Sequence, residues 1–318
     1  MAAMAAPHLS IVVPMFNEEE VLPLFIARLR PVADGLGVSY EVVAVDDGSH
    51  DQTAIGLQRA RRDWPQLRVI RLRANSGHQA AISAGLARAR GAYVVTLDAD
   101  LQDPPEVVAE MLAAAQEKHV DVVYGIRGDR SSDSVFKRAT ARFFYRSMDK
   151  LAETGAHHDA GDFRLMSRAT VDAINALPEY GRVLRFVVPA LGFPSASVTY
   201  RRDERAAGSS KYPFAKMLRL SIDSVTAFSL APLRFATFLG LAGGLGALVL
   251  LLYALYARAA GHVVAGWTST VVIVTAVGAV QLLALGILGE YVGRLYAASQ
   301  ARPSYYVAYD SEEEQRAP

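Results

Sequence analysis

The sequence predicts an α/β fold, with a mostly parallel sheet and helices on both faces, followed by juxtamembrane amphipathic helices and a two-helix transmembrane hairpin. Short apolar runs alternate with stretches of helical length over about the first 125 residues, which is typical of β-α-β units. The short runs are almost wholly apolar, as strands covered on both faces are. Two uncharged runs, 235–257 and 263–289, each exceed the roughly 20 residues that cross a bilayer.

The elements follow in order along the N-terminal part. Strands are expected at 9–14, 40–47, 67–72, 92–98 and 120–125. The helices between them are expected at 18–29, 51–62, 77–90 and 106–118. Acidic residues occupy the expected first turn of the first helix, Gly91 is the expected C-cap of the third, and prolines precede the fourth.

Composition divides the chain into four parts. A globular domain is expected over 1–210, juxtamembrane amphipathic helices over 211–234, two transmembrane helices at about 235–257 and 265–289 within 235–294, and a tail over 295–318. Arg234 and Arg294 flank the apolar runs, so the positive-inside tendency places both flanks in the cytoplasm. Buried core helices are the alternative, which the length of two tandem runs disfavours. The acidic stretch SEEEQRAP near the end is expected to be disordered.

Overall composition excludes several classes of function. The formal net charge is +1, which gives no global signature of nucleic-acid binding. The chain has no Cys, which removes disulfides, thiolate zinc sites and Cys nucleophiles. The opening MAAMAAPHLS lacks the basic region and apolar core of a signal peptide, so the N-terminal part is expected in the cytosol.

Polar clusters follow all five expected strands. Their sequences are PMFNEE, DDGSHD, ANSGHQ, DADLQD and GIRGDR. Each could be an ordinary turn or helix cap. Ligands of such sheets bind beyond the carboxyl ends of the strands, however. Five clusters at equivalent strand ends therefore favour a binding site.

The fourth cluster contains hard oxygen ligands. Asp98 and Asp100 are two residues apart and share one side of an extended backbone, and Gln102 adds an amide oxygen. Mg²⁺ or Mn²⁺ suits such oxygens and usually completes its shell with water and substrate phosphates. A solvated acidic loop is the alternative. Neither a Walker A loop nor a G-x-G-x-x-G motif after the first strand is present, which argues against a P-loop hydrolase and a dinucleotide cofactor.

Taken together, these motifs resemble those of glycosyltransferase family 2, whose members have the GT-A fold. The matching stretches are IVVPMFNEE, VVAVDDGSHD, NSGHQAAISAG, LDADLQDPPE and VVYGIR. DAGDFRLMSR and RRDERAAGSSKYPF resemble a narrower branch, the polyprenyl-phosphate glycosyltransferases related to dolichyl-phosphate mannose synthase. The GHQAA form and the apolar runs are similar to those of bacterial undecaprenyl-phosphate glucosyltransferases. The resemblance extends from Leu9 to about Val307.

The resemblance implies roles for individual positions. Nucleotide-sugar binding is implied for Pro14, Phe16, Asn17, Glu18, Asp46, Asp47, Asn75, Gly77, His78 and Asp98. Metal binding is implied for Asp98, Asp100 and Gln102. Lipid-phosphate binding is expected of Arg127, Arg138, Ser210 and Lys211, and catalytic roles of Asp100, Asp162, Arg127, Arg205 and Lys211. The wider family often has Lys where this chain has His78, a departure that argues against a purely electrostatic role there.

The implied reaction is an inverting, metal-dependent transfer of a hexose from a nucleotide-diphosphate sugar, with UDP-glucose as first choice, to undecaprenyl or another polyprenyl phosphate. A phosphate monoester whose second pKa is about 6 is mostly dianionic at neutral pH, so its attack requires no general base. Mg²⁺ or Mn²⁺ would neutralise the leaving diphosphate. The lipid-linked product would serve cell-envelope glycan modification. The expected location is the cytoplasmic (inner) membrane, with the catalytic domain and both termini in the cytoplasm.

A basic stripe suggests how a lipid acceptor is reached. Arg138, Arg142, Arg146 and Lys150 recur every four residues, which suits a helix on an anionic membrane surface. A solvated helix face over an ordinary core gives the same pattern. Gly240 and Gly244 permit close helix contact, and a homo-oligomer is left open. The expected partners are the nucleotide sugar, the polyprenyl phosphate and the membrane, with no nucleic acid.

Other functions remain as alternatives. A processive polysaccharide synthase typically carries Q-x-x-R-W, and neither Trp64 nor Trp267 lies in that context. An inactive homologue acting as a membrane scaffold would be favoured by loss of the Asp pair or the basic loop, and both are present. Transfer to another lipid, to a polysaccharide or to protein stays open.

Overall fold

The computed structural model describes residues 6–128, 160–178, 182–203, 231–261 and 266–316. The chain divides into two compact units: 1–145, 154–211 and 302–318 form one, and 146–153 and 212–301 form the other. Several predictions lie outside the described residues. They concern the basic stripe at Arg138, Arg142, Arg146 and Lys150, the positions Arg205, Ser210 and Lys211, and most of the expected juxtamembrane helices.

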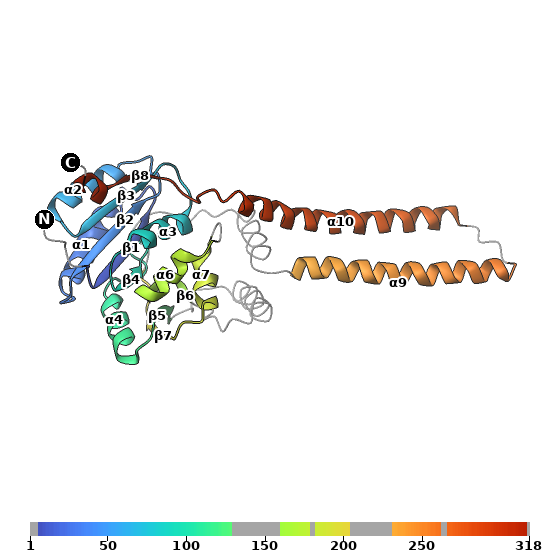
Figure 1. The fold of residues 1–318 in the computed structure, drawn as a ribbon, viewed down its shortest axis with the longest axis horizontal. Helices are drawn as coiled ribbons and strands as arrows, with labels where there is room; N and C mark the ends of the chain where they lie inside the picture. The colour runs from blue at the N-terminus through green and yellow to red at the C-terminus, as the bar shows by residue number, and fades with distance from the viewer. Residues whose placement is uncertain (1–5, 129–159, 179–181, 204–230, 262–265, 317–318) are drawn as a thin grey trace. The chain divides into compact units, whose positions relative to one another are not determined.

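The first unit is built on an eight-stranded sheet in the order β7-β5-β6-β4-β1-β2-β3-β8 (Figure 1). The strands are β1 Leu9–Met15, β2 Tyr40–Asp46, β3 Leu67–Leu72, β4 Tyr93–Thr96, β5 Val122–Arg127, β6 Ala160–Ser167, β7 Ser195–Tyr200 and β8 Val307–Asp310. β1 pairs in parallel with β2 and β4, β2 pairs in parallel with β3, and β5 pairs in parallel with β7. β6 is antiparallel to β4 and β5, and β8 is antiparallel to β3. The predicted mostly parallel sheet is confirmed.

Helices cover both faces of this sheet, as the apolar strands predict. One core layer contains α1 (Leu22–Asp34), α2 (Thr53–Asp63) and α4 (Val107–Lys118). The opposite layer contains α3 (His78–Arg88), α6 (Arg168–Ala176) and α7 (Leu184–Ala190). All residues of β1 are buried between the two layers, so the central strands are fixed from both sides and their carboxyl ends can hold side chains rigidly.

Two local predictions were wrong. α1 begins at Leu22, so the expected acidic residues precede its first turn. α3 ends at Arg88 with Ala89 as its C-cap, so Gly91 does not cap it. Gly91 instead permits a close approach of two strands, because a Cβ there would lie 2.5 Å from both the Ser10 nitrogen and the Tyr93 oxygen.

The C-terminal segment belongs to the sheet of the first unit. β8 forms its edge beside β3, and α11 (Ser311–Arg316) follows directly. The prediction of a disordered acidic tail is therefore wrong over Ser311–Arg316. Its carboxylates have specific basic partners, which are described below.

The second unit contains α9 (Ala231–Ala259) and α10 (Trp267–Ser299), which pack against each other. By length and composition both could cross a membrane, over Phe235–Ala257 and Val272–Ser299. Neither window is buried in the structure, which argues against the alternative of core helices. The second apolar helix continues to Ser299, beyond the expected end near residue 289.

Candidate active site

The loops after β1 and β2 are joined by hydrogen bonds. The backbone N–H of Asn17 donates to Ser49 Oγ at 2.9 Å, and Asn17 Oδ1 accepts from the His50 N–H at 2.9 Å. Asn17 has a φ of 55°, a left-handed conformation that Asn tolerates better than most residues. The Glu18 N–H donates to a threonine hydroxyl at the start of α2. Phe16 is 38% exposed, with its ring edge-on to His50, and so offers a flat apolar surface at this edge.

Asp46 is buried at the end of β2. Its Oδ1 accepts from the Ser49 N–H at 2.9 Å. Its Oδ2 lies 3.2 Å from Arg71 Nε but accepts no hydrogen bond from any described residue. A buried carboxylate oxygen normally accepts at least one, so Asp46 has capacity for an N–H or O–H from a ligand.

Asp47 ties the loop after β3 to the loop after β2. It accepts from the backbone N–H groups of Ser76 at 2.7 Å and Gly77 at 2.9 Å. Burial raises the pKa of Asp47, although these two bonds oppose the rise. Gly48 has a φ of +69°, and a Cβ there would lie 2.8 Å from the Asn75 nitrogen. Glycine is therefore required for the two loops to approach.

His78, the first residue of α3, faces two carboxylates. Its Nε2 lies 3.4 Å from Asp98 Oδ1 and 3.5 Å from Asp162 Oδ2. Burial opposes protonation of the imidazole, but the hydrogen bond to Asp162 and the charges of the nearby carboxylates raise its pKa overall. At this position the chain thus places a cation-forming side chain between the fourth strand and β6.

Asp162 on β6 is the most strongly organised acid of the site. Gln79 Nε2 donates to its Oδ2 at 3.0 Å, and Gln79 Oε1 accepts from the Leu184 N–H. Arg164 Nη2 lies 3.2 Å from its Oδ1, and Arg185 lies 4.0 Å from its Oδ2. Burial disfavours the charged carboxylate, but His78 and the two arginines lower its pKa well below the usual value. Asp162 is therefore held as an anion.

Asp98 has the opposite character. Burial raises its pKa to about 6, the nearby His78 opposes the rise, and the charges of Asp103, Asp162 and Asp100 add to it. Negative charge at this edge of the sheet is therefore incompletely compensated. Asp100 Oδ1 accepts the Gln102 N–H at 3.1 Å, and Leu101 between them has a φ of 58°, so the acidic loop is tightly turned.

The donor set fits a hard divalent cation. Asp98 and Asp100 supply carboxylate oxygens, and the raised pKa of Asp98 marks the place where added positive charge is favourable. Within the described residues no three Asp, Glu, His or Cys side chains form a metal-binding group. Mg²⁺ commonly uses only one or two protein carboxylates together with substrate phosphates, so two are sufficient.

Gln102 makes different contacts from those expected of a metal ligand. Its Oε1 accepts from Arg202 Nη2, and its backbone oxygen accepts from the Asp203 N–H at 3.0 Å. Asp203 also lies 2.9 Å from Arg28 Nη2 on α1. In this structure, Gln102 therefore anchors the segment that follows β7 to the acidic loop.

Arg127, at the end of β5, lies beside the acidic cluster. Its Nη2 is 3.8 Å from Asp103 Oδ1, which also accepts from the Tyr200 hydroxyl. A Cβ on Gly161 would lie 3.4 Å from Arg127 Nη2, so the guanidinium lies against the residue before Asp162. Arg127 Nε is buried and has no hydrogen-bond partner among the described residues.

The structure thus brings many of the sequence-predicted residues to one edge of the sheet. His78 contacts both Asp98 and Asp162, Asp47 bonds the loop of Asn75 and Gly77, and Arg127 lies next to Gly161. Pro14 is buried within β1. Sequence reasoning missed Gln79, Arg164 and Arg185. Gln79 lies inside the motif NSGHQAAISAG and Arg164 inside DAGDFRLMSR. Their place in these motifs was the one feature of the sequence that could have identified them.

Comparison with known proteins identifies the family. A family model described as glycosyl transferase family 2 matches residues 10–174. The uncharacterized glycosyltransferase YkcC of Bacillus subtilis (strain 168) is 40% identical over 94% of this chain and 92% of its own length. The bactoprenol glucosyl transferase of Shigella phage SfV is 36% identical over 94% of this chain and 97% of its own length.

Solved structures show the same fold. Glucosyl-3-phosphoglycerate synthase from Mycobacterium tuberculosis, solved with Mn²⁺, UDP-glucose and phosphoglyceric acid, aligns with a TM-score of 0.51 at 18% identity, covering 71% of this chain and 80% of that chain. At this identity the likeness establishes the GT-A fold alone. Together with the family match, it shows that this chain belongs to glycosyltransferase family 2 and is a glycosyltransferase.

Proposed function

We propose that this enzyme transfers a hexose, with glucose as the first candidate, from a UDP-sugar to undecaprenyl phosphate or a related polyprenyl phosphate, with inversion at the anomeric carbon. One observation carries the proposal. The same chain combines an undercompensated acidic cluster at the carboxyl edge of a GT-A sheet with two helices long and apolar enough to cross a bilayer. A relative over nearly its full length is named a bactoprenol glucosyl transferase, which supports a polyprenol acceptor.

The donor half of the site would use the loops after β1, β2 and β4. The unsatisfied Oδ2 of Asp46 can accept an N–H from a nucleobase, and Phe16 offers a surface against which a base can stack. Asp98 and Asp100 would hold Mg²⁺ or Mn²⁺. When bound, the cation neutralises charge on the leaving diphosphate. Asp47, Asn75 and Gly77 keep the loops in place, and Gln102 is proposed as a ligand only after release from Arg202.

The acceptor half would gather around Asp162 and Arg127. A dianionic phosphate already has a nucleophilic oxygen, so the enzyme must mainly align two anionic substrates and shield their charges. Arg127 and His78 can provide positive charge on either side of Asp162. Asp162, kept ionised by its neighbours, can orient a sugar hydroxyl or stabilise positive charge developing at the anomeric carbon. Arg138, Arg205, Ser210 and Lys211 are proposed contributors on the basis of the family resemblance.

The proposed location is the cytoplasmic membrane. α9 and α10 would form the transmembrane hairpin, with the catalytic domain and both termini on the cytoplasmic side. The Glu290–Arg294 ion pair, at 2.8 Å, lies in the last third of α10, where an interfacial position would suit its charges. The remaining domain boundaries are proposed as the sequence predicts them.

A reconstitution experiment tests the acceptor and the donor together. Purified full-length protein in nanodiscs receives undecaprenyl phosphate, Mg²⁺ or Mn²⁺, and one of a panel of UDP- and GDP-sugars, and nucleotide release is followed. We expect UDP release from UDP-glucose that depends on the lipid phosphate. Equal release with and without the lipid would overturn the acceptor assignment, and a preference for another sugar would correct the donor.

A further inference from the structure

The C-terminal segment docks on strand β3 through backbone and side-chain contacts, and its own strand β8 forms the edge of the sheet. Ile70 is paired with Asp310 and Arg71 with Tyr309 in antiparallel register. The Val69 N–H donates to Ser311 Oγ at 3.0 Å, which continues the docking beyond the strand. These partners lie more than 230 residues apart in sequence, so the segment closes the sheet from the far end of the chain.

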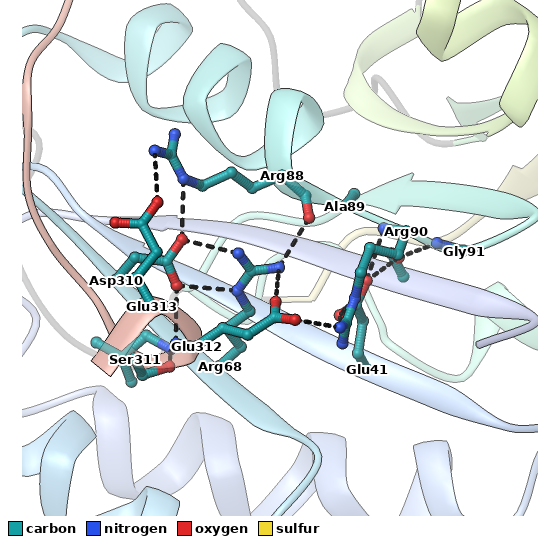
Figure 2. Close-up of polar contacts among 12 residues, drawn as sticks. Glu41, Arg68, Arg88, Ala89, Arg90, Gly91, Asp310, Ser311, Glu312 and Glu313 are labelled. Carbon is teal, nitrogen blue, oxygen red and sulfur yellow. Dashed lines mark hydrogen bonds and ion pairs between the residues drawn. The ribbon is translucent and has the colours of Figure 1, made fainter. Parts of the chain in front are cut away.

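Beside β3, acidic residues and arginines alternate in one continuous network of ion pairs. Figure 2 shows the contacts, whose order is Glu41, Arg90, Glu312, Arg68, Asp310, Arg88 and Glu313. Each of the three arginines thus lies between two carboxylates. Three of the four acids come from the C-terminal segment, so its removal would leave Glu41 as the one remaining acid of this network within the part of the protein that the structure describes.

Asp310 is the centre of this network. Its side chain is fully buried and accepts hydrogen bonds from Arg68 Nε, Arg68 Nη2, Arg88 Nε and the Glu312 N–H. Burial disfavours its charge, but the bonds and charges of Arg68 and Arg88 lower its pKa overall. A buried carboxylate with several charge-assisted bonds holds its partners in one geometry.

Arg88 and Arg68 connect Asp310 to helix α3, which also carries residues of the candidate active site. Arg88 is the last residue of α3, and its backbone oxygen accepts from Arg68 Nη1 at 2.9 Å. The first residues of the same helix are His78 and Gln79, which contact Asp162. A helix of 11 residues is a rod of about 16 Å. The C-terminal segment therefore fixes one end of an element whose other end carries two site residues.

We propose that Asp310 is a positioning residue for the nucleotide-sugar site, acting through Arg88 and Arg68 on the C-terminal end of α3. The segment that follows the second apolar helix would thereby set the position of His78 and Gln79 and of the loop that precedes them. This inference rests on the proposed donor site, because it assigns the distant support of that site. Asp310 itself would contact neither substrate, so it is not proposed as a catalytic residue.

The test compares variants that cut the link at different points. Arg88→Gln removes the side-chain contact between α3 and Asp310. It leaves Asp310 paired with Arg68 and keeps the bond from Arg68 to the backbone oxygen of residue 88. Arg88→Lys keeps the charge. Glu313→Gln is the matched control, because Glu313 also pairs with Arg88 but is 69% exposed and 3.6 Å away. Asp310→Asn removes the charge at the centre of the network. If the Asp310→Asn protein does not fold, the Arg88→Gln protein provides the test.

Two readouts are taken on full-length protein. The first is the Kd of UDP with Mn²⁺, and the second is hydrogen–deuterium exchange of backbone amides over residues 75–88 without nucleotide. We expect Arg88→Gln and Asp310→Asn to raise the Kd of UDP by about fivefold, the lower end of usual coupling strengths. Both should also speed hydrogen–deuterium exchange at the beginning of α3. Arg88→Lys should recover most of the affinity, and Glu313→Gln should match the wild type.

The outcomes separate this inference from the proposed function. Wild-type UDP affinity and unchanged exchange over 75–80 in Arg88→Gln would overturn the positioning role, even if the variant melts at a lower temperature. A wild-type protein that binds UDP but transfers no sugar to polyprenyl phosphate would contradict the proposed function and leave the positioning result intact. If UDP does not bind the wild type, the exchange readout alone decides.

Discussion

At the scale of single residues, the site contrasts two aspartates in one cluster. Asp162 is surrounded by cationic and amide donors and has a lowered pKa, whereas Asp98 faces mostly other carboxylates and has a pKa raised to about 6. Environments that separate the pKa values of neighbouring acids are typical of functional sites. The first aspartate is held as an anion, and the second carries the charge that the proposed metal ion would compensate.

The raised pKa of Asp98 predicts a pH-dependent affinity for metal. A proton and a metal ion compete for the same carboxylate, so Mn²⁺ affinity should rise with pH and level off above about pH 6. Below that pH the affinity should fall by about tenfold per pH unit. Titration calorimetry between pH 5 and 8 measures this. An Asp98→Asn control should bind weakly at every pH, and a wild-type Kd that does not change with pH would contradict the assignment.

Gln79 should matter for turnover because its amide orients Asp162. Gln79→Met keeps the length of the side chain but removes both hydrogen bonds. We expect kcat to fall by about tenfold, the equivalent of ~1.4 kcal/mol for one bond to a charged group, while the KM of the donor changes little. Gln116→Met, at an exposed position of α4, is the matched control. Steady-state kinetics measure both constants, and a UDP titration gives the concentration of folded enzyme, because a loss of folded enzyme would also lower the apparent kcat without changing KM.

At the scale of elements, β6 links the core to the site. Arg164 is fully buried in this strand and donates to the backbone oxygens of Leu184 and Gly161. Its guanidinium also lies 5.9 Å from the centre of the Tyr124 ring. One side chain therefore connects β6, the start of α7 and Asp162.

Replacement of Arg164 should be costly for stability. Arg164→Met would remove the donor of two buried carbonyl groups and one of the partners of Asp162, and removal of one partner from a buried pair usually costs about 3–5 kcal/mol. We expect a markedly lower unfolding temperature by differential scanning fluorimetry. Arg59→Met is the control, because Arg59 is exposed and has no ion-pair partner among the described residues. Equal unfolding temperatures for both variants would show that Arg164 contributes little.

The sequence predicted the elements with strong local patterns and missed those that depend on distant partners. The five apolar strands and their helices follow from local periodicity. β8 has only four residues, and its register and the order of α11 depend on arginines more than 200 residues away. Gly91 was misassigned as a C-cap because the close approach of Ser10 and Tyr93 has no local signal. In the site, motif residues were found, while the supporting roles of Gln79 and Arg164 required the fold.

At the scale of the whole molecule, both ends of the chain contribute to one catalytic sheet. β1 lies at its centre and β8 at its edge, although two helices of membrane-spanning length separate β8 from the other strands in sequence. The sheet is complete only after the second apolar helix has been made. Folding of the catalytic unit and formation of the helical pair are thus linked through the chain itself.

The identity of the lipid product tests the central claim most directly. Full-length protein in nanodiscs is incubated with UDP-glucose, Mn²⁺ and either undecaprenyl phosphate or undecaprenol, and the organic extract is examined by mass spectrometry. We predict one hexose on the lipid phosphate, in a one-to-one ratio with released UDP, and no product from undecaprenol or from the Asp100→Ala enzyme. Hexose on undecaprenol, or UDP release without a glycosylated lipid phosphate, would contradict the account.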